Sequence, residues 1–187
     1  EYYSVTNWEV SPNGEILAWL EDTSGYEHAT LHMRTIATGE VVDEAIIEVG
    51  AFDLAWLDDE HIFYTRYDES SRPDRVYRHR LGTSSADDVE VASEPDGRFW
   101  VGVSRLSDGS GVIISIGSTL TSDVRFIASG SGESVPQEIL PRVEGIEYDV
   151  NHHGDRFLVR INDAGDNFRI VEVQDDSLGS VGRELVP

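Results

Sequence analysis

Apolar and polar residues alternate in short runs along the whole chain, and polar turns separate the runs. Segments 31–36 and 76–81 place apolar and polar side chains on opposite faces, as half-buried β-strands do. No stretch of ten or more residues shows the periodicity of an amphipathic helix. Turn-forming pairs such as Asn13-Gly14, Asp108-Gly109 and His153-Gly154 recur at the spacing of hairpins. The pattern predicts an all-β protein.

A unit of strand, polar turn and strand occurs four times. Its turns centre on Asn13, Asp58, Asp108 and His153, so successive units lie 45, 50 and 45 residues apart. Two more strands fit into each unit, at 31–36 and 45–49, 76–81 and 89–92, 123–128 and 138–140, and 168–173 and 184–186. Four strands in a repeat of this length are typical of a β-propeller blade. We therefore expect about four four-stranded blades, at approximately 1–50, 51–97, 98–143 and 144–187.

Four blades predict a partial propeller, because propellers close with about 4–8 blades and many rings are larger. Each blade buries its faces against its neighbours, so an open array is expected to expose apolar sheet faces at both ends. The chain also begins with Glu1 rather than with methionine. We expect a fragment of a larger, seven-bladed ring, and an isolated fragment that associates through its end blades.

The charge of the chain is strongly negative. It has 36 acidic and 14 basic residues, a net charge of −22, and all the basic residues are arginine. Nucleic acids and anionic membranes need a cationic surface, so the charge argues against both as partners. Two interpretations stay open: a solvated acidic shell, or an acidic field that attracts cationic ligands such as Arg-rich peptides.

The composition of the chain excludes cysteine-based cross-links and metal sites, and it argues against a membrane-spanning segment. Without cysteine, neither a disulfide nor a thiolate metal site can form. No apolar run approaches the roughly 20 residues that span a bilayer. The lack of cysteine also fits a reducing compartment, and we expect a cytoplasmic protein.

No motif of the chain predicts a catalytic serine. The nearest approach to the G-x-S-x-G nucleophile motif is Gly132-Glu133-Ser134-Val135-Pro136, which lacks the last glycine and is not followed by a predicted helix. Carboxylate pairs are uninformative in a chain this acidic, because solvated turns explain them. We expect no catalytic residue.

Two stretches invite a metal-binding interpretation. Neighbours on a strand point to opposite faces, so His152 and His153 can reach one ion only from a turn. A hairpin turn with one histidine packed and one solvated explains the pair better. The acidic stretch 162–167 lacks the residue order of an EF-hand, so we expect a hairpin loop there. The sequence predicts no metal site and no cofactor.

The segment 62–83 carries the most distinctive loop. Strands at 62–67 and 76–81 flank a polar loop, 68–74, in which Pro73 argues against a central strand. The loop contains Asp68, Glu69 and Arg72. It is either an exposed tip held by its own ion pairs or an edge that meets another domain. We therefore regard Asp68, Glu69 and Arg72 as a possible interdomain contact.

Three stretches resemble the propeller region of the prolyl oligopeptidase family of serine peptidases, most closely its oligopeptidase B branch. They are Val10-Ser11-Pro12-Asn13-Gly14-Glu15-Ile16-Leu17-Ala18-Trp19; Phe63-Tyr64-Thr65-Arg66 with Arg78-His79 and Leu81-Gly82-Thr83; and Glu147-Tyr148-Asp149-Val150 with His152-His153-Gly154-Asp155-Arg156-Phe157. The second stretch is the most specific.

This resemblance implies a function. In that family a seven-bladed propeller caps an α/β-hydrolase domain with a Ser-Asp-His triad and admits only short peptides, and oligopeptidase B enzymes cut after arginine or lysine. None of the triad residues falls in this chain. The resemblance implies a gating propeller segment, with the hydrolase domain of the same chain as its partner and short basic peptides as substrates of the parent enzyme. The alternative is a β-propeller scaffold for protein interactions, which predicts exposed aromatic hot spots on one face and no hydrolase domain.

Overall fold

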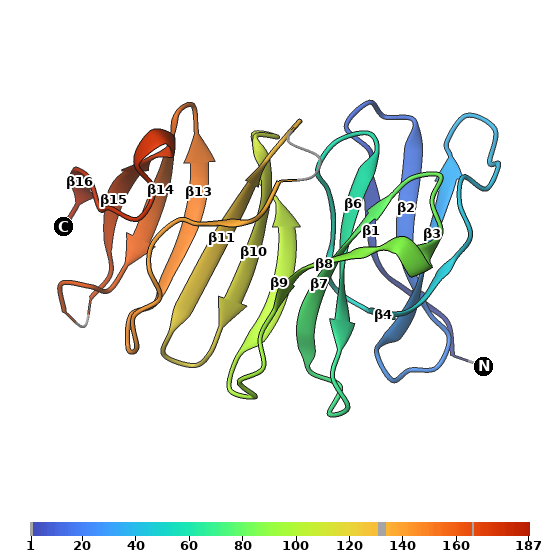
Figure 1. The fold of residues 1–187 in the computed structure, drawn as a ribbon, viewed down its shortest axis with the longest axis horizontal. Coiled ribbons are helices and arrows are strands. Elements are labelled where there is room, and N and C mark those ends of the chain that lie inside the picture. Colours follow the sequence, from blue (N-terminus) through green and yellow to red (C-terminus); the bar gives the residue numbers. More distant parts are fainter. Residues whose placement is uncertain (1, 131–133, 166) are drawn as a thin grey trace.

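The computed structural model describes residues 2–130, 134–165 and 167–187, which form four antiparallel four-stranded sheets (Figure 1). Each sheet consists of four consecutive strands and is called a blade. Blade 1 contains β1 (Ser4–Val10), β2 (Ile16–Asp22), β3 (His28–Thr35) and β4 (Ile46–Gly50); blade 2 contains β5 (Leu54–Trp56), β6 (His61–Tyr67), β7 (Pro73–Arg80) and β8 (Val89–Ser93). Blade 3 contains β9 (Trp100–Arg105), β10 (Gly111–Gly117), β11 (Ser122–Ala128) and β12 (Gln137–Glu138); blade 4 contains β13 (Tyr148–His153), β14 (Arg156–Ile161), β15 (Arg169–Gln174) and β16 (Glu184–Val186). Two short 3-10 helices, η1 (Ser85–Asp87) and η2 (Asp175–Ser177), precede the last strands of blades 2 and 4.

The blades stand side by side, and an apolar core fills each space between neighbours (Figure 1). Leu20 of blade 1 and Tyr64 of blade 2 belong to the first core. Phe63 and Ile114 belong to the second core, and Phe157 to the third. Burying a large apolar side chain completely stabilises a fold by about 1.5–3 kcal/mol. Packing between blades therefore sustains the array.

The connections gather at two opposite edges. The hairpins between the second and third strands of the blades lie at the lower edge in Figure 1, and the turns between the first and second strands lie at the upper edge. Because the strands alternate in direction, the segments that join one blade to the next return to the lower edge. The lower edge thus carries both these hairpins and the links between blades.

The all-β prediction and the four-stranded units are confirmed, with two local corrections. The predicted loop 68–74 is shorter, because Pro73 pairs with Tyr67 and begins β7. Proline is tolerated as the first residue of a strand. The predicted turn around His152 is also shorter, since β13 continues to His153, which pairs with Arg156. Only Gly154 and Asp155 remain in that turn.

The two end faces of the array differ in chemistry. On the outer face of blade 1, Val5, Trp8, Leu17, Trp19 and Ile36 line an apolar hollow of about 650 Å³. The outer face of blade 4 is instead crossed by ion pairs, namely Arg160–Asp149, Arg156–Glu172 and Arg183–Glu172. The expectation of apolar faces at both ends is therefore met at blade 1 and wrong at blade 4. No helix in the described ranges is long and apolar enough to cross a membrane.

Candidate functional site

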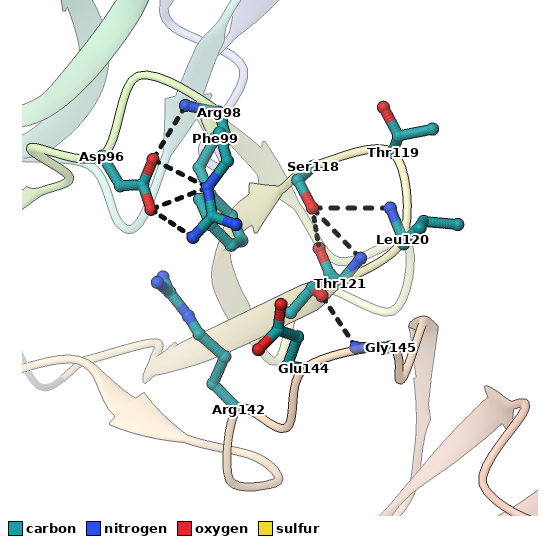
Figure 2. A pocket seen from close by; sticks show the side chains of 10 residues that line it. All are labelled: Asp96, Arg98, Phe99, Ser118, Thr119, Leu120, Thr121, Arg142, Glu144 and Gly145. Carbon is teal, nitrogen blue, oxygen red and sulfur yellow. Dashed lines mark hydrogen bonds and ion pairs between the residues drawn. The ribbon is translucent and has the colours of Figure 1, made fainter.

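A hollow of about 540 Å³ opens at the lower edge of blade 3 (Figure 2). Three segments line it: the link from β8 to β9, the β10–β11 hairpin, and the link from β12 to β13. Their lining residues are Asp96, Arg98 and Phe99; Ser118, Thr119, Leu120 and Thr121; and Arg142, Glu144 and Gly145. The hollow therefore exists only because the blades bring three distant loops together.

Arg98 and Asp96 form one side of the hollow (Figure 2). Nη2 of Arg98 lies 2.7 Å from Oδ2 of Asp96, and Nε lies 3.1 Å from both carboxylate oxygens. These hydrogen bonds from Arg98 lower the pKa of Asp96 to about 2. The pair is charged at neutral pH, and its exposure makes it worth little to stability.

Arg142 also lines the hollow and connects two buried carboxylates. Its Nη2 donates to Oε2 of Glu94 at 2.6 Å and to Oδ2 of Asp123 at 3.1 Å. Its guanidinium also lies 4.4 Å from the centre of the Phe99 ring, a cation–π distance. Arg142 thereby fixes the link between blades 3 and 4 against the link between blades 2 and 3.

The hydroxyls of the hollow stabilise turns. Ser118 Oγ accepts from the backbone N–H groups of Leu120 and Thr121, at 3.4 and 3.1 Å. Thr121 Oγ1 accepts from Gly145 N–H at 3.0 Å. The described lining residues include no histidine that could activate either hydroxyl as a nucleophile. The hollow has two arginines and two carboxylates, which suits polar binding rather than covalent chemistry.

One serine does lie beside a histidine, at the lower edge between blades 1 and 2. His28 Nε2 is 3.4 Å from Ser71 Oγ, and His28 Nδ1 is 3.3 Å from Glu48 Oε2, in the order of a Ser-His-acid triad. No sequence motif indicates this group, because its members come from separate loops and strands. However, the N–H groups of Ser71 and Arg72 donate to Asp68, so neither is free to form an oxyanion hole. We do not assign catalysis to it.

The three residues of the predicted interdomain contact are in different environments. Glu69 is exposed at the tip of the β6–β7 hairpin. Arg72 is buried, and donates from Nε to Asp68 Oδ2 at 2.9 Å and from its terminal nitrogens to the carbonyl oxygens of Glu94, Asp96 and Phe99. Hydrogen bonds from Arg72 and Ser70 lower the pKa of Asp68. Arg72 therefore fixes the hairpin to blade 3 and leaves Glu69 as the outward group.

One histidine of the pair His152 and His153 is packed and the other is solvated, as the sequence predicted. His152 is buried, with Nδ1 2.7 Å from Asp108 Oδ2 and Nε2 3.1 Å from Asp175, whereas His153 is exposed. Within the described ranges, no three His, Asp or Glu side chains are grouped as metal ligands. Of the other stretches considered, Gly132, Glu133 and Asp166 lie outside the described residues.

Four consecutive four-stranded antiparallel blades, packed side by side, define a β-propeller segment. The whole chain, residues 1–187, matches the model of the prolyl oligopeptidase N-terminal β-propeller domain. The chain therefore belongs to the prolyl oligopeptidase family.

Two curated relatives and two solved structures show how much of such proteins the chain represents. The chain is 34% identical over 180 residues to dipeptidyl aminopeptidase BI of Pseudoxanthomonas mexicana, covering 95% of this chain and 25% of that protein. It is 30% identical over 182 residues to protease 2 of Moraxella lacunata, covering 96% and 26%. Oligopeptidase B from Trypanosoma brucei superposes with a TM-score of 0.88 at 26% identity, covering 100% of this chain and 26% of that one. Oligopeptidase B from Leishmania major has the same fold, with a TM-score of 0.91 at 22% identity, covering 99% and 26%. The chain thus spans about a quarter of the length of these proteins.

Proposed function

We propose that this chain is the gating propeller segment of a serine oligopeptidase, called the parent below, whose α/β-hydrolase domain lies outside residues 1–187. The observation that carries the proposal is the match of the entire chain to the propeller domain of a peptidase family. The segment restricts access to the active site and hydrolyses nothing by itself.

The charge and composition of the chain support a proposal for the substrates and the cellular setting of the parent. A net charge of −22 creates a field that attracts cationic peptides to the ring. We propose that the parent cuts short peptides after arginine or lysine, in the cytoplasm, where a chain without cysteine loses nothing to the reducing conditions.

The β6–β7 hairpin is proposed to contact the hydrolase domain through its tip. Arg72 holds the tip in place, so Glu69 can meet a partner without a large loss of loop entropy. Glu69→Arg in the parent is expected to lower kcat/KM several-fold by opposing this contact. Glu60→Arg, at the opposite edge of the same blade, serves as the matched control. Equal activity of both variants and the unchanged parent would remove the hairpin from the interface.

The direct test of the gating proposal compares the parent with this chain. A dibasic fluorogenic peptide should be cut by the parent and left intact by the chain. Ser71→Ala in the chain checks that no trace hydrolysis comes from the Ser71–His28–Glu48 group. A parent without peptidase activity would favour an interaction scaffold, for which the exposed Trp8 and Ile36 on blade 1 are the supporting observation.

A further inference from the structure

A second hollow at the lower edge combines aromatic rings with carboxylates. It measures about 460 Å³, a volume suited to a small ligand group, and lies where blades 1, 2 and 3 meet. Phe52 and Trp100 line it with 54% and 60% of their surfaces exposed, and Tyr67 forms a further wall. Exposed rings of this kind are costly in water unless a partner covers them.

Two carboxylates face these rings. Asp53 lies at the start of β5 and accepts a single weak hydrogen bond, from Val103 N–H at 3.4 Å. Glu27 comes from the β2–β3 hairpin, where it adopts φ 64°, a backbone conformation that usually needs glycine. Glu27, Asp53 and Asp22 all raise the pKa of Tyr67, after burial, because their negative charges act on its phenol. Two of these carboxylates, Glu27 and Asp53, line the hollow, whereas Asp22 is buried beside it in the β2–β3 hairpin.

No positive charge balances them inside the hollow. Among the described lining residues there is no arginine, and the chain contains no lysine. The nearest imidazole, His28, packs edge-on against Tyr67 at 5.2 Å. Asp53 has no ion pair within the part of the chain that the structure describes. A carboxylate held among aromatic rings without a cation is the arrangement that recognises an organic cation.

We propose that this hollow binds the cationic side chain of an arginine-containing peptide. The guanidinium pairs with Asp53 and Glu27 and stacks on Trp100 or Tyr67. The role of this hollow in the parent rests on the proposed gating function. There the hollow would hold a basic residue of a substrate on the propeller, away from the bond that is cut.

The burial of Asp53 predicts that cation binding in this hollow depends on pH. Burial raises the pKa of Asp53 to about 6, whereas the N–H of Val103 lowers it slightly. A bound cation favours the ionised carboxylate, so binding should weaken as the pH falls through 6. The other titratable groups in or beside the hollow are Glu27, Asp22, Tyr67 and His28. Asp53→Asn should flatten the part of the pH dependence that belongs to Asp53.

The test titrates this chain with Nα-acetylarginine amide and Nα-acetylcitrulline amide, a neutral analogue of nearly the same shape, and follows binding by calorimetry at low salt and pH 7.5. We expect the arginine compound to bind about tenfold more tightly than the citrulline compound. Asp53→Asn and Trp100→Ala should each weaken arginine binding by about tenfold. Asp176→Asn, which removes one exposed charge on blade 4, should leave it unchanged. Circular dichroism confirms that each variant is folded.

Equal binding of the two compounds, or no binding of either, would overturn the proposal. An equal loss in Asp53→Asn and Asp176→Asn would also overturn it, because that result indicates a diffuse acidic field. The titration needs no hydrolase domain, so its failure would leave the gating proposal standing. Conversely, an inactive parent would leave the binding result standing.

Discussion

The guanidinium of Arg72 lies between blades 2 and 3, where it donates to one carboxylate and three backbone carbonyls. The sequence showed a charged loop, and a charged loop is usually solvated. Burial could not be read from the pattern, because the acceptors at Glu94, Asp96 and Phe99 lie on another link. At the scale of single residues, structure therefore changed the interpretation of Arg72 most.

Replacing Arg72 should destabilise the fold strongly. Arg72→Ala removes the buried donor of these bonds, and the expected loss is about 3 kcal/mol in the free energy of unfolding. Urea unfolding followed by tryptophan fluorescence measures it. Arg80→Ala is the control, since its side chain is 59% exposed and its pair with Glu60 should contribute no more than about 0.5 kcal/mol. Equal losses in the two variants would contradict the role given to Arg72.

The Ser71–His28–Glu48 group could not have been found from the sequence. Its members are 43 and 20 residues apart, counting from His28 to Ser71 and to Glu48, and their spacing matches no known motif. Only the meeting of blades 1 and 2 brings them together. By contrast, the sequence predicted one packed and one solvated histidine at 152–153, although it placed them in a hairpin turn. Both lie on β13, where the alternation of side chains separates them.

Histidines connect neighbouring blades at the scale of elements. His152 of β13 reaches Asp108 in the β9–β10 turn, so it ties blade 4 to blade 3. His79 of β7 lies 2.7 Å from Asp88 in its own blade and 3.5 Å from Asp43 of blade 1. Burial lowers the pKa of both histidines, but the neighbouring carboxylates outweigh burial and raise it above 6.5.

These histidines predict a dependence of stability on pH. A raised folded pKa means that the contribution is complete below pH 6.5, the ordinary value, and is lost as the pH rises through the folded pKa. We expect the free energy of unfolding to fall from pH 6 to pH 9. His152→Gln should reduce this slope, while His153→Gln, at the exposed neighbour, should not. An identical slope in both variants would contradict the inter-blade role of His152.

The acidic partner of His152 stays ionised over that range. Burial raises the pKa of Asp108, but hydrogen bonds from Ser110 and His152 outweigh it and lower the pKa to about 2. Asp175 and Asp155 also face His152. Titration of Asp108 therefore affects stability only at more acidic pH, where the sign reverses and stability falls as this carboxylate is protonated.

A glycine sets the spacing of two strands in blade 3. A Cβ on Gly111 would overlap the carbonyl oxygen of Ile127 and the ring of Phe126, whereas one on Gly117, at the other end of β10, would meet no atom within 4 Å. Gly111→Ala is expected to cost about 2–3 kcal/mol in the free energy of unfolding through overpacking. Gly117→Ala should change it by less than about 1 kcal/mol. Thermal unfolding of both variants tests this, and similar melting temperatures would contradict it.

Most strands could be predicted because alternation and turn chemistry act locally. The predicted segment 184–186 coincides with β16, and 123–128 lies within β11. The ends of strands were less certain, because pairing partners decide them. Pro73 belongs to β7 because it pairs with Tyr67, and His152 belongs to β13 because it pairs with Phe157. A single stretch of sequence does not reveal either pairing.

The outer faces of the two end blades differ, and this difference affects the association of the whole molecule. Blade 1 exposes Trp8 and Ile36 around an apolar hollow, while blade 4 presents arginine–carboxylate pairs to solvent. The sequence predicted apolar faces at both ends and gave no sign of this asymmetry. A closed ring would cover the outer face of blade 1, and in the isolated chain it stays open.

We expect the isolated chain to self-associate through blade 1. Leu17→Glu places a charge in the apolar hollow and should shift the chain towards the monomer, because an interface cannot bury an unpaired carboxylate cheaply. Leu158→Glu, on the half-buried outer side of β14, is the control and should leave the association unchanged. Analytical ultracentrifugation distinguishes the outcomes. A monomeric unmodified chain, or equal effects of the two variants, would exclude blade 1 as the interface.

The most direct test of the central claim is the dependence of hydrolysis by the parent on substrate length. One Arg-Arg cleavage sequence is presented in a short peptide and within a long, unfolded polypeptide, and kcat/KM is measured for both. A gating propeller predicts efficient cleavage of the short peptide and little or none of the long one, because both expose the same bond and differ only in what must pass the ring. Similar kcat/KM values for the two substrates would contradict the claim that this chain restricts access.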